Sequence, residues 1–186
     1  MPVFIGLLRA VNVGGKNKVS MSQLREALAR AGYSRVKTLL QSGNLLLVTT
    51  QRSGFNLAEE LATIVERELG VKTEVIVRSP AQLRQIIDEN PFDVEAGKEP
   101  SRVFVFFTRD AATAKDIERL RESRSGAEEI RSRGRQLYVY YPTGMGQSKL
   151  TGTVIERIVK TRATARNWNT VLKLADLAAT ALDEDA

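Results

Sequence analysis

The stretch "VKTLLQSGNLLLV", residues 36–48, decides the fold of the N-terminal half of this chain. Two apolar runs flank the polar segment Gln41-Ser42-Gly43-Asn44, in which glycine and asparagine supply the positive φ that a tight turn requires. We therefore expect two antiparallel strands, at residues 36–40 and 45–48, joined as a hairpin.

The segments on either side of the hairpin predict an alternation of strands and helices. An apolar run at residues 3–8 is typical of a buried strand, and apolar spacings of three and four predict an amphipathic helix over residues 21–31. A second helix is expected at residues 57–69 and a further strand at residues 75–77. The order of elements through residue 78 is therefore βαββαβ.

The second half of the sequence begins the same order again. A strand is predicted at residues 103–107, a helix at 111–120, two strands at 127–130 and 137–141, and a helix at 150–159. No last strand is evident in this half. In its place, residues 167–181 predict a helix with a wide apolar stripe that includes Trp168, and we expect this helix to cap the sheet of the second half.

These elements predict an α+β fold of duplicated ferredoxin-like (βαββαβ) units with a C-terminal capping helix. The first predicted subdomain spans residues 1–90, and the second spans residues 101–186 together with the C-terminal helices. The segment "NPFDVEAGKEP", residues 90–100, combines two prolines, a glycine and several charges, which is typical of a linker.

The composition excludes several classes of chemistry. The 186 residues include no histidine and no cysteine, so thiolate nucleophiles, zinc sites, iron–sulfur clusters and histidine-based triads are excluded. A magnesium site with oxygen ligands, a lysine amine, a hydroxyl nucleophile or a carboxylate pair stays possible. The sequence therefore indicates no particular cofactor and leaves open whether the protein is an enzyme.

Charge and hydropathy bear on partners and location. Lysine and arginine number 28 against 22 aspartate and glutamate, a formal net charge of +6 that favours an anionic small molecule or nucleic acid as partner. No run approaches the roughly 18 consecutive apolar residues of a membrane span, and no basic segment precedes the first apolar run. We expect a cytoplasmic protein without a membrane partner.

Several separated motifs carry a resemblance to a known family. They are "LLRAVNVGGKNKVSMSQLREAL" (7–28), "QSGNLLL" (41–47), "NPF" (90–92), "YYPTGMGQSKL" (140–150) and "TARNWNTVLKLADLA" (164–178). Together and in this order they resemble the bacterial family known as domain of unknown function 1697. The resemblance spans nearly the whole chain and implies a two-part α/β fold of duplicated ferredoxin-like units, but it implies no activity.

The loop "NVGGKNK", residues 12–18, leaves a strand and precedes a helix. Backbone N–H groups and the positive end of a helix can hold a phosphate or carboxylate at such a corner, Gly14 and Gly15 permit close approach, and Lys16 adds charge. It is not a P-loop, because Ala10 stands where the first glycine of that motif should be. The alternative is a turn that needs glycine geometry and whose lysines face water.

The segment "PTGMGQSK", residues 142–149, is expected at the corresponding strand-to-helix position of the second half. It lacks the dinucleotide-binding fingerprint, because Lys149 stands where the third glycine should be. Ser148 as a helix N-cap is the alternative to a ligand contact. Arg166 and Asn167, beside Trp168, supply further polar groups, although an asparagine N-cap next to a buried tryptophan explains the same pattern.

The sharpest hypothesis is that both glycine loops face one cleft and bind one anionic ligand. The hairpin turn could add polar groups that read a base or sugar edge, although turns favour the same residue types. The predicted ligand-binding residues are Arg9, Asn12, Gly14, Gly15, Lys16, Gln41, Ser42, Asn44, Ser148, Lys149, Arg166 and Asn167.

Two further classes of function stay open. Phe104, Phe106, Tyr138 and Tyr140 lie at period two on predicted strands and could form a base-stacking platform, although core packing beneath the Trp168 helix explains them better. The other class is a structural or regulatory homodimer, because a sheet of this kind has edge strands that can pair between chains.

Overall fold

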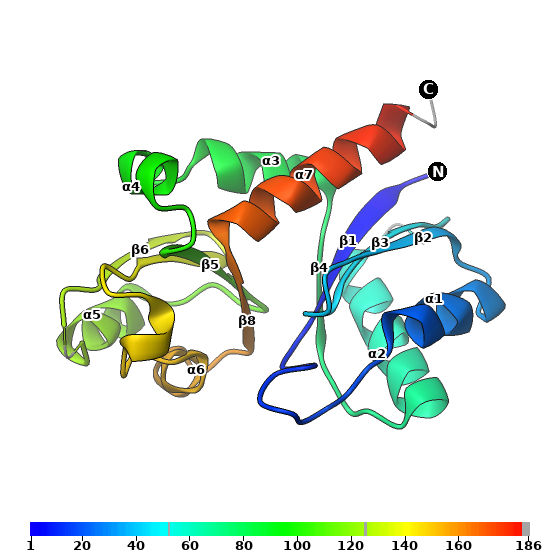
Figure 1. The fold of residues 1–186 in the computed structure, drawn as a ribbon, viewed down its shortest axis with the longest axis horizontal. Helices are drawn as coiled ribbons and strands as arrows, with labels where there is room; N and C mark the ends of the chain where they lie inside the picture. Colours follow the sequence, from blue (N-terminus) through cyan, green and yellow to red (C-terminus); the bar gives the residue numbers. More distant parts are fainter. Residues whose placement is uncertain (52, 125, 184–186) are drawn as a thin grey trace. The chain divides into compact units, whose positions relative to one another are not determined.

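The computed structural model describes residues 1–51, 53–124 and 126–183. Within them the chain forms two compact units (Figure 1). The first contains Met1–Arg84 and the C-terminal segment from Leu174, and the second contains Gln85–Lys173. Each unit carries its own four-stranded antiparallel sheet and its own helices, so the fold is mixed α+β.

The first unit follows the predicted order of elements. They are β1 (Val3–Leu8), α1 (Met21–Arg30), β2 (Ser34–Leu39), β3 (Asn44–Val48), α2 (Gly54–Leu69) and β4 (Val75–Arg78). The strands lie in the order β2-β3-β1-β4, and every neighbouring pair is antiparallel. Strand β1 and the hairpin of β2 and β3 are therefore confirmed, with ends that differ by at most two residues.

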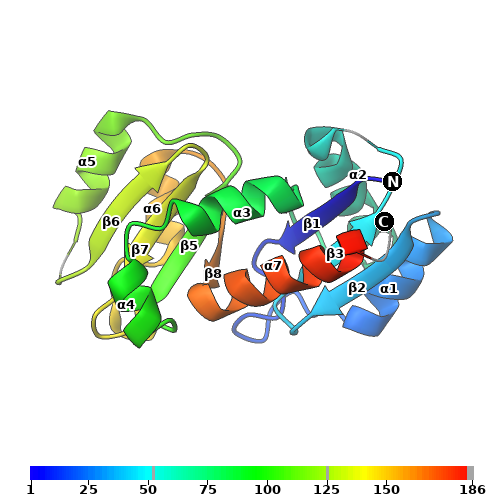
Figure 2. The ribbon, with the colours of Figure 1, turned by 90° about the horizontal axis from the view of Figure 1, so that it is seen from above.

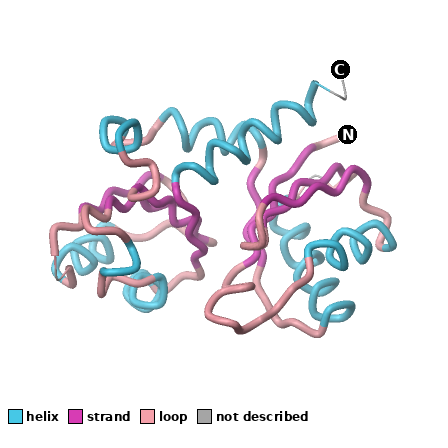
Figure 3. The backbone as a smooth tube through the Cα atoms, viewed as in Figure 1, coloured by secondary structure: helices cyan, strands magenta, loops and turns pink. Residues whose placement is uncertain are grey.

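Both faces of this sheet are buried, which explains the continuous apolar runs in its strands. Phe4, Leu8 and Leu45 belong to the core that the sheet forms with α1 and α2, and both helices lie on this face (Figure 3). On the other face, Ile5 and Leu46 are fully buried as well.

The second unit contains the rest of the elements. They are the end of α3 (Pro80–Asp88), α4 (Asp93–Lys98), β5 (Val103–Thr108), α5 (Ala114–Glu122), β6 (Glu129–Arg133), β7 (Gln136–Tyr140), the 3₁₀ turn Met145–Gln147, α6 (Gly152–Val159), β8 (Ala163–Asn167) and the start of α7 (Trp168–Asp183). The strand order is β6-β7-β5-β8, again with every neighbouring pair antiparallel (Figure 2).

Two expectations for this unit are corrected. The second half does have a last strand, β8, whose residues "ATARN" lack the apolar run by which strands were recognised. The expected linker at residues 90–100 contains α4, and Phe92 and Ala96 beside and within it are buried. Buried apolar side chains hold this segment against the unit in spite of its prolines and glycine.

Helix α7 divides between the two units. Residues Trp168–Lys173 group with the second unit, as expected, whereas the part from Leu174 onward groups with the first. Leu174, Ala178 and Ala181 in that later part are buried. The two units therefore share this helix, and the subdomain bounds 1–90 and 101–186 stay a prediction.

The two units have buried polar residues at corresponding strand positions, which is a pattern expected of a duplication. Opposite Ile5 of β1 stands Arg78, and opposite Val105 of β5 stands Arg166; both arginines are buried. A buried amide side chain likewise begins the third strand of each unit, as Asn44 in one and Gln136 in the other. The similarity thus extends from element order to the polar residues inside each sheet.

Candidate functional site

The first glycine loop, residues 9–20, contains a tight turn. Gly14 and Gly15 have φ of 59° and 74°, and the Lys16 N–H donates to the Val13 carbonyl at 3.2 Å. Left-handed φ at both central positions is the geometry of a type I′ turn, which glycine adopts without strain. The glycines are therefore required by the turn, and the Lys16 amide is already hydrogen-bonded within the loop.

Asn12 joins this loop to the turn between β2 and β3. Its Nδ2 donates to the carbonyls of Val19 at 2.9 Å and Gln41 at 2.7 Å, and its Oδ1 accepts from the Val19 N–H at 2.9 Å. The amide of Asn12 thus holds two loops together and has its donors and acceptor engaged by main chain. The structure brings Asn12 and Gln41 together, as the site hypothesis requires, but the contact is from the Asn12 side chain to the Gln41 main chain.

Left-handed backbone is concentrated in these two loops. Of the six described residues other than glycine with positive φ, four lie here, and only Arg35 and Lys160 lie elsewhere; the four are Ala10, Asn12, Asn17 and Leu40. Ala10 and Leu40 carry a Cβ atom that disfavours this conformation, so surrounding contacts must maintain it. Strained backbone of this kind persists where the neighbouring structure fixes it.

The side chains around the two loops differ in exposure. Lys16, Lys18 and Gln41 are exposed, whereas Arg9 is half-buried, with its carbonyl accepting from the Thr73 hydroxyl at 2.7 Å. The first loop therefore presents two ammonium groups to solvent.

The turn interpretation is confirmed for the polar residues that follow Gln41. Asn44 is fully buried, and its Nδ2 donates to the Leu39 carbonyl at 2.8 Å and to the Ser42 Oγ at 2.9 Å. Gly43 has φ of 74°, and a Cβ there would lie 2.5 Å from Val11. The second left-handed φ of this turn is that of Leu40 and not, as predicted, that of Asn44.

The second glycine loop, residues 141–151, is built differently. The Ser148 Oγ donates to the Glu128 carboxylate and accepts from the Leu150 N–H at 3.0 Å. The N-cap of α6 is Thr151, whose hydroxyl accepts from the Val154 N–H at 3.4 Å. The expectation that Ser148 caps this helix is therefore corrected, because its hydroxyl is held by Glu128, while Lys149 is exposed.

Sequence reasoning missed Glu128, which dominates the charge of this loop. Its side chain is buried, and its pKa is held below the ordinary value chiefly by the Ser148 hydroxyl, in spite of the opposing effect of burial. The carboxylate is therefore ionised at neutral pH. Gly126 permits its approach, since a Cβ there would lie 3.1 Å from Glu128 Oε2. Only this glycine, shortly before two acids and a strand, could have signalled the contact.

The two glycine loops also occupy different places in their units. The first follows β1, whose end pairs with the start of β3, since Leu7 stands opposite Asn44. The second follows β7, whose end pairs with the start of β5, since Tyr140 stands opposite Val103. The strand equivalent to β7 is β3, not β1. The expectation that the two loops are in corresponding positions is therefore wrong.

Arg166 and Asn167 both have internal partners. Arg166 Nη1 donates to the Thr164 Oγ1 at 2.8 Å and the Ala165 carbonyl at 2.7 Å, and burial lowers its pKa to about 10. The Asn167 Oδ1 accepts from the Thr170 N–H at 3.0 Å, which makes Asn167 the N-cap of α7. With Trp168 buried, the N-cap interpretation of this segment is confirmed.

The four aromatic residues proposed as a base-stacking platform lie on opposite faces of their sheet. Residues directly opposite in an antiparallel pair share a face, and Phe104 and Phe106 stand opposite Val139 and Leu137 in the core. Tyr138 and Tyr140 stand opposite Val105 and Val103 on the other face. Tyr138 is fully buried and donates to the Ile86 carbonyl at 2.7 Å. The platform hypothesis is therefore wrong, because side chains alternate between faces along each strand.

Among residues 1–51, 53–124 and 126–183, no helix is long and apolar enough to cross a membrane. No three acidic side chains gather there in a way that could hold a metal ion.

The comparisons with known proteins identify relatives of unknown function. The fold is similar to that of the conserved bacterial protein SP0830 from Streptococcus pneumoniae, with a TM-score of 0.73 and 20% sequence identity over 95% of this chain and 98% of that one. No curated protein matches the sequence. The family profile described as protein of unknown function (DUF1697) matches residues 1–138. The chain therefore belongs to the DUF1697 family.

Proposed function

We propose that the paired loops of the first unit, residues 9–20 and 40–43, bind an anionic ligand such as a nucleotide, a phosphorylated metabolite or a nucleic-acid backbone. The observation that carries the proposal is the concentration of left-handed backbone in these loops, which Asn12 ties together. Strained backbone clusters at ligand sites because the strain serves to pre-organise the site. No other pair of loops in the described residues has a comparable concentration.

The charges of these loops support an anion as the ligand. Lys16 and Lys18 are exposed, Gly14 and Gly15 have no side chain to keep a ligand from the backbone, and Gln41 adds an exposed amide. Ammonium groups and unhindered backbone N–H groups are the donors that phosphate groups accept in proteins.

Glu128 argues against an anion at the second loop. An ionised carboxylate bonded to Ser148 repels phosphate and already occupies the hydroxyl that would donate to it. The hypothesis that one ligand also contacts Ser148, Lys149, Arg166 and Asn167 stays a prediction. The proposal made here concerns an anion at the loops of the first unit.

We further propose that each unit is ferredoxin-like. A βαββαβ order, with the first strand between the third and the fourth in a fully antiparallel sheet, supports that assignment in both units. The cytoplasmic location stays a prediction from the sequence.

A structural homodimer is the second candidate, and the edge strands disfavour one route to it. Strand β2 has a register shift between Ser34 and Lys37, where Arg35 has φ of 50°. Strand β6 carries Arg131 and Arg133. Bulges and charges on edge strands oppose pairing between chains, so a dimer would need a surface other than β2 and β6.

Isothermal titration calorimetry tests the ligand proposal. ATP, AMP, inorganic phosphate and a short single-stranded RNA are titrated into the protein and into the double variant Lys16→Ala/Lys18→Ala, with Lys115→Ala, an exposed lysine of α5, as the control. We expect binding of a phosphate-bearing ligand, weakened about tenfold by the double variant and unchanged by the control. Absence of binding to all four, or equal loss in the control, would refute the proposal.

A further inference from the structure

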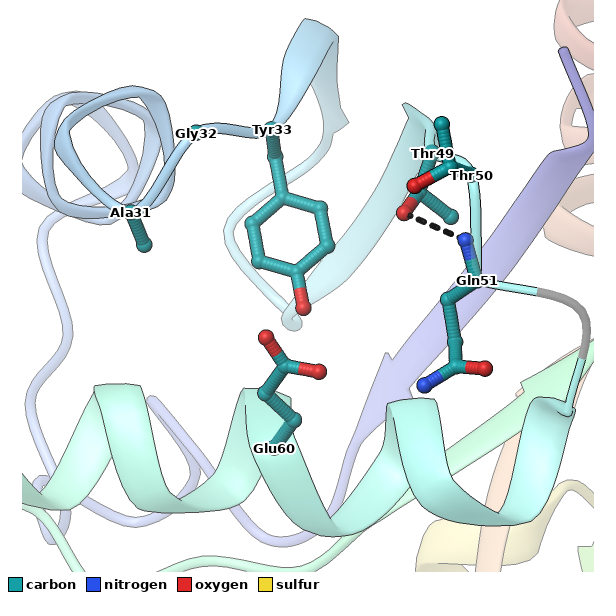
Figure 4. A pocket seen from close by; sticks show the side chains of 7 residues that line it. All are labelled: Ala31, Gly32, Tyr33, Thr49, Thr50, Gln51 and Glu60. Carbon is teal, nitrogen blue, oxygen red and sulfur yellow. Dashed lines mark hydrogen bonds between the residues drawn. The ribbon is translucent and has the colours of Figure 1, made fainter.

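A polar pocket lies in the first unit, where the end of α1, the exit of β3 and the middle of α2 meet (Figure 4). Its volume is about 420 Å³, within the range of small-molecule sites. The residues that line it are Ala31, Gly32, Tyr33, Thr49, Thr50, Gln51 and Glu60. None of them belongs to the glycine loops, so the pocket is a separate feature of this unit.

The local sequence fixes Tyr33 at the wall of this pocket. Helix α1 ends in a Schellman motif, in which the Gly32 N–H donates to Ala29 at 3.0 Å and the Tyr33 N–H donates to Leu28 at 3.1 Å. Gly32 takes the left-handed φ of 91° that the motif requires. The motif turns the chain so that Tyr33 enters the unit immediately before β2.

The Tyr33 hydroxyl is buried and has no hydrogen-bond partner among the described residues. Only 7% of the residue is exposed, and its hydroxyl points toward the Glu60 carboxylate (Figure 4). Burial, followed by the Glu60 carboxylate as a nearby hydrogen-bond acceptor and as a negative charge, raises the pKa of Tyr33 above its usual range, so the hydroxyl keeps its proton. A buried hydroxyl without a partner destabilises the fold, and a bound group that hydrogen-bonds to it removes that loss.

The charge of the pocket favours a cation. Glu60, which is exposed on α2, is the one charged residue in the lining. Ala31 and Gly32 lie at the C-terminal end of α1, where the helix dipole is negative. Both features attract a positive group to a pocket whose other functional groups are hydroxyls and an amide.

The second unit has an equivalent corner, and there the chain itself fills it. Ser34 stands opposite Val48, and Glu129 stands opposite Tyr140, so Tyr33 and Glu128 hold the same position before the second strand. In the second unit the longer loop after β7 brings the Ser148 hydroxyl onto Glu128. In the first unit the shorter segment after β3 leaves the space open beside Tyr33.

We propose that this pocket binds a small hydrophilic molecule with a primary ammonium group, which lies between the Tyr33 hydroxyl and the Glu60 carboxylate. The ammonium group donates to the Glu60 carboxylate and to the Tyr33 oxygen, as the Ser148 hydroxyl donates to Glu128 in the other unit. The site is independent of the anion site proposed above and prefers the opposite charge.

The test is a titration followed by amide chemical shifts in two-dimensional NMR. The probe is 1,4-diaminobutane, and 1,4-butanediol, of equal length but uncharged, is the matched control at constant ionic strength. We expect saturable shifts at Gly32, Thr50 and Gln51 with the diamine and much smaller shifts with the diol. Inorganic phosphate should leave these amides unchanged, which separates this site from the anion site.

Two variants and a matched control complete the test. Glu60→Gln is expected to weaken diamine binding about tenfold or more, and Tyr33→Phe about threefold, from the loss of a charged and a neutral hydrogen bond. Glu66→Gln makes the same charge change at another exposed position of α2 and should leave binding unchanged. Shifts that do not saturate, equal shifts with the diol, or equal weakening by Glu66→Gln would overturn the proposal; the same spectra report whether each variant is folded.

Discussion

The two glycine loops have similar sequences and different structures. Both combine glycines with a lysine between a strand and a helix, yet the first exposes Lys16 and Lys18, whereas the second packs Ser148 against an ionised carboxylate. The difference arises outside the loops, because Asn12 ties the first to the hairpin turn and Glu128 enters the second from the start of β6. The charge that a loop offers to a ligand therefore depends on residues distant in the sequence.

The corners before β2 and β6 differ in the same way. Tyr33 and Glu128 occupy equivalent positions, and each has a buried oxygen without a hydrogen-bond partner among the described residues. One corner is closed by Ser148 and the other is open. The closed corner of the second unit therefore indicates which kind of group, a hydrogen-bond donor, would fill the open corner of the first. The predictions below test these differences, beginning with the largest expected effect.

Asn12→Ala is expected to have the largest effect, because it removes three hydrogen bonds between the first loop, Val19 and Gln41. The free energy of unfolding should fall by about 2–3 kcal/mol, since main-chain groups lose partners and alanine disfavours the left-handed φ. Urea denaturation measures the change. Asn17→Ala, which removes a single bond to Ala10, is the control and should cost less. Equal losses would show that Asn12 does not hold the loops together.

Glu128→Gln tests whether the carboxylate closes the second loop. Replacing the charge-assisted bond from Ser148 by a neutral one should lower the free energy of unfolding by about 1 kcal/mol. The neighbouring Glu129→Gln, which touches an exposed ion pair with Arg131, should change it by about half as much or less. Urea denaturation of both variants at neutral pH measures these changes. An unchanged free energy of unfolding in Glu128→Gln would contradict our description of this loop.

The difference in the free energy of unfolding between Glu128→Gln and the wild type should depend on pH. The folded-state pKa of Glu128 lies below its unfolded value, so its contribution to stability is complete above about pH 4.3. That contribution is lost as the pH falls through the folded-state pKa. Denaturation curves at several pH values should therefore converge for the two proteins in acid. A gap that widens as the pH falls would mean that Glu128 is protonated in the folded protein.

Tyr33→Phe should have the smallest effect on stability. The hydroxyl has no hydrogen-bond partner among the described residues, so its removal should change the free energy of unfolding by about 0.5 kcal/mol or less, or raise it. Tyr141→Phe is a suitable comparison, because the Tyr141 hydroxyl donates to the Leu150 carbonyl at 2.9 Å. Its removal should lower the free energy of unfolding by about 1 kcal/mol. A larger loss for Tyr33→Phe would mean that its hydroxyl has a structural partner.

Local sequence patterns predicted the elements that have strong apolar periodicity. Strand β1 and the hairpin of β2 and β3 follow from apolar runs and turn residues. Strand β8 was missed because "ATARN" alternates small and polar residues, and α4 because the prolines that flank it and the glycine within it are typical of loops. In both, burial in the tertiary structure outweighs the local preference.

The candidate site was harder to predict, because its contacts join distant segments. Asn12 and Gln41 are 29 residues apart, and Glu128 and Ser148 are 20 apart. The side chains of Asn12, Asn44 and Asn167 have internal hydrogen bonds, which residue type alone does not reveal. Lys16 and Lys149 are both exposed and look alike in the sequence. Their different settings become visible only when the carboxylate beside Ser148 is known.

The most direct test of our central claim is a titration of isotope-labelled protein with ATP, followed by the backbone amides of both glycine loops. We predict saturable shifts at Gly14, Gly15 and Lys16 and none at Gly144 or Ser148, because only the first loop presents cations without a carboxylate. Shifts confined to the second loop, or no saturable shift in either loop with ATP, AMP, inorganic phosphate or RNA, would contradict the account.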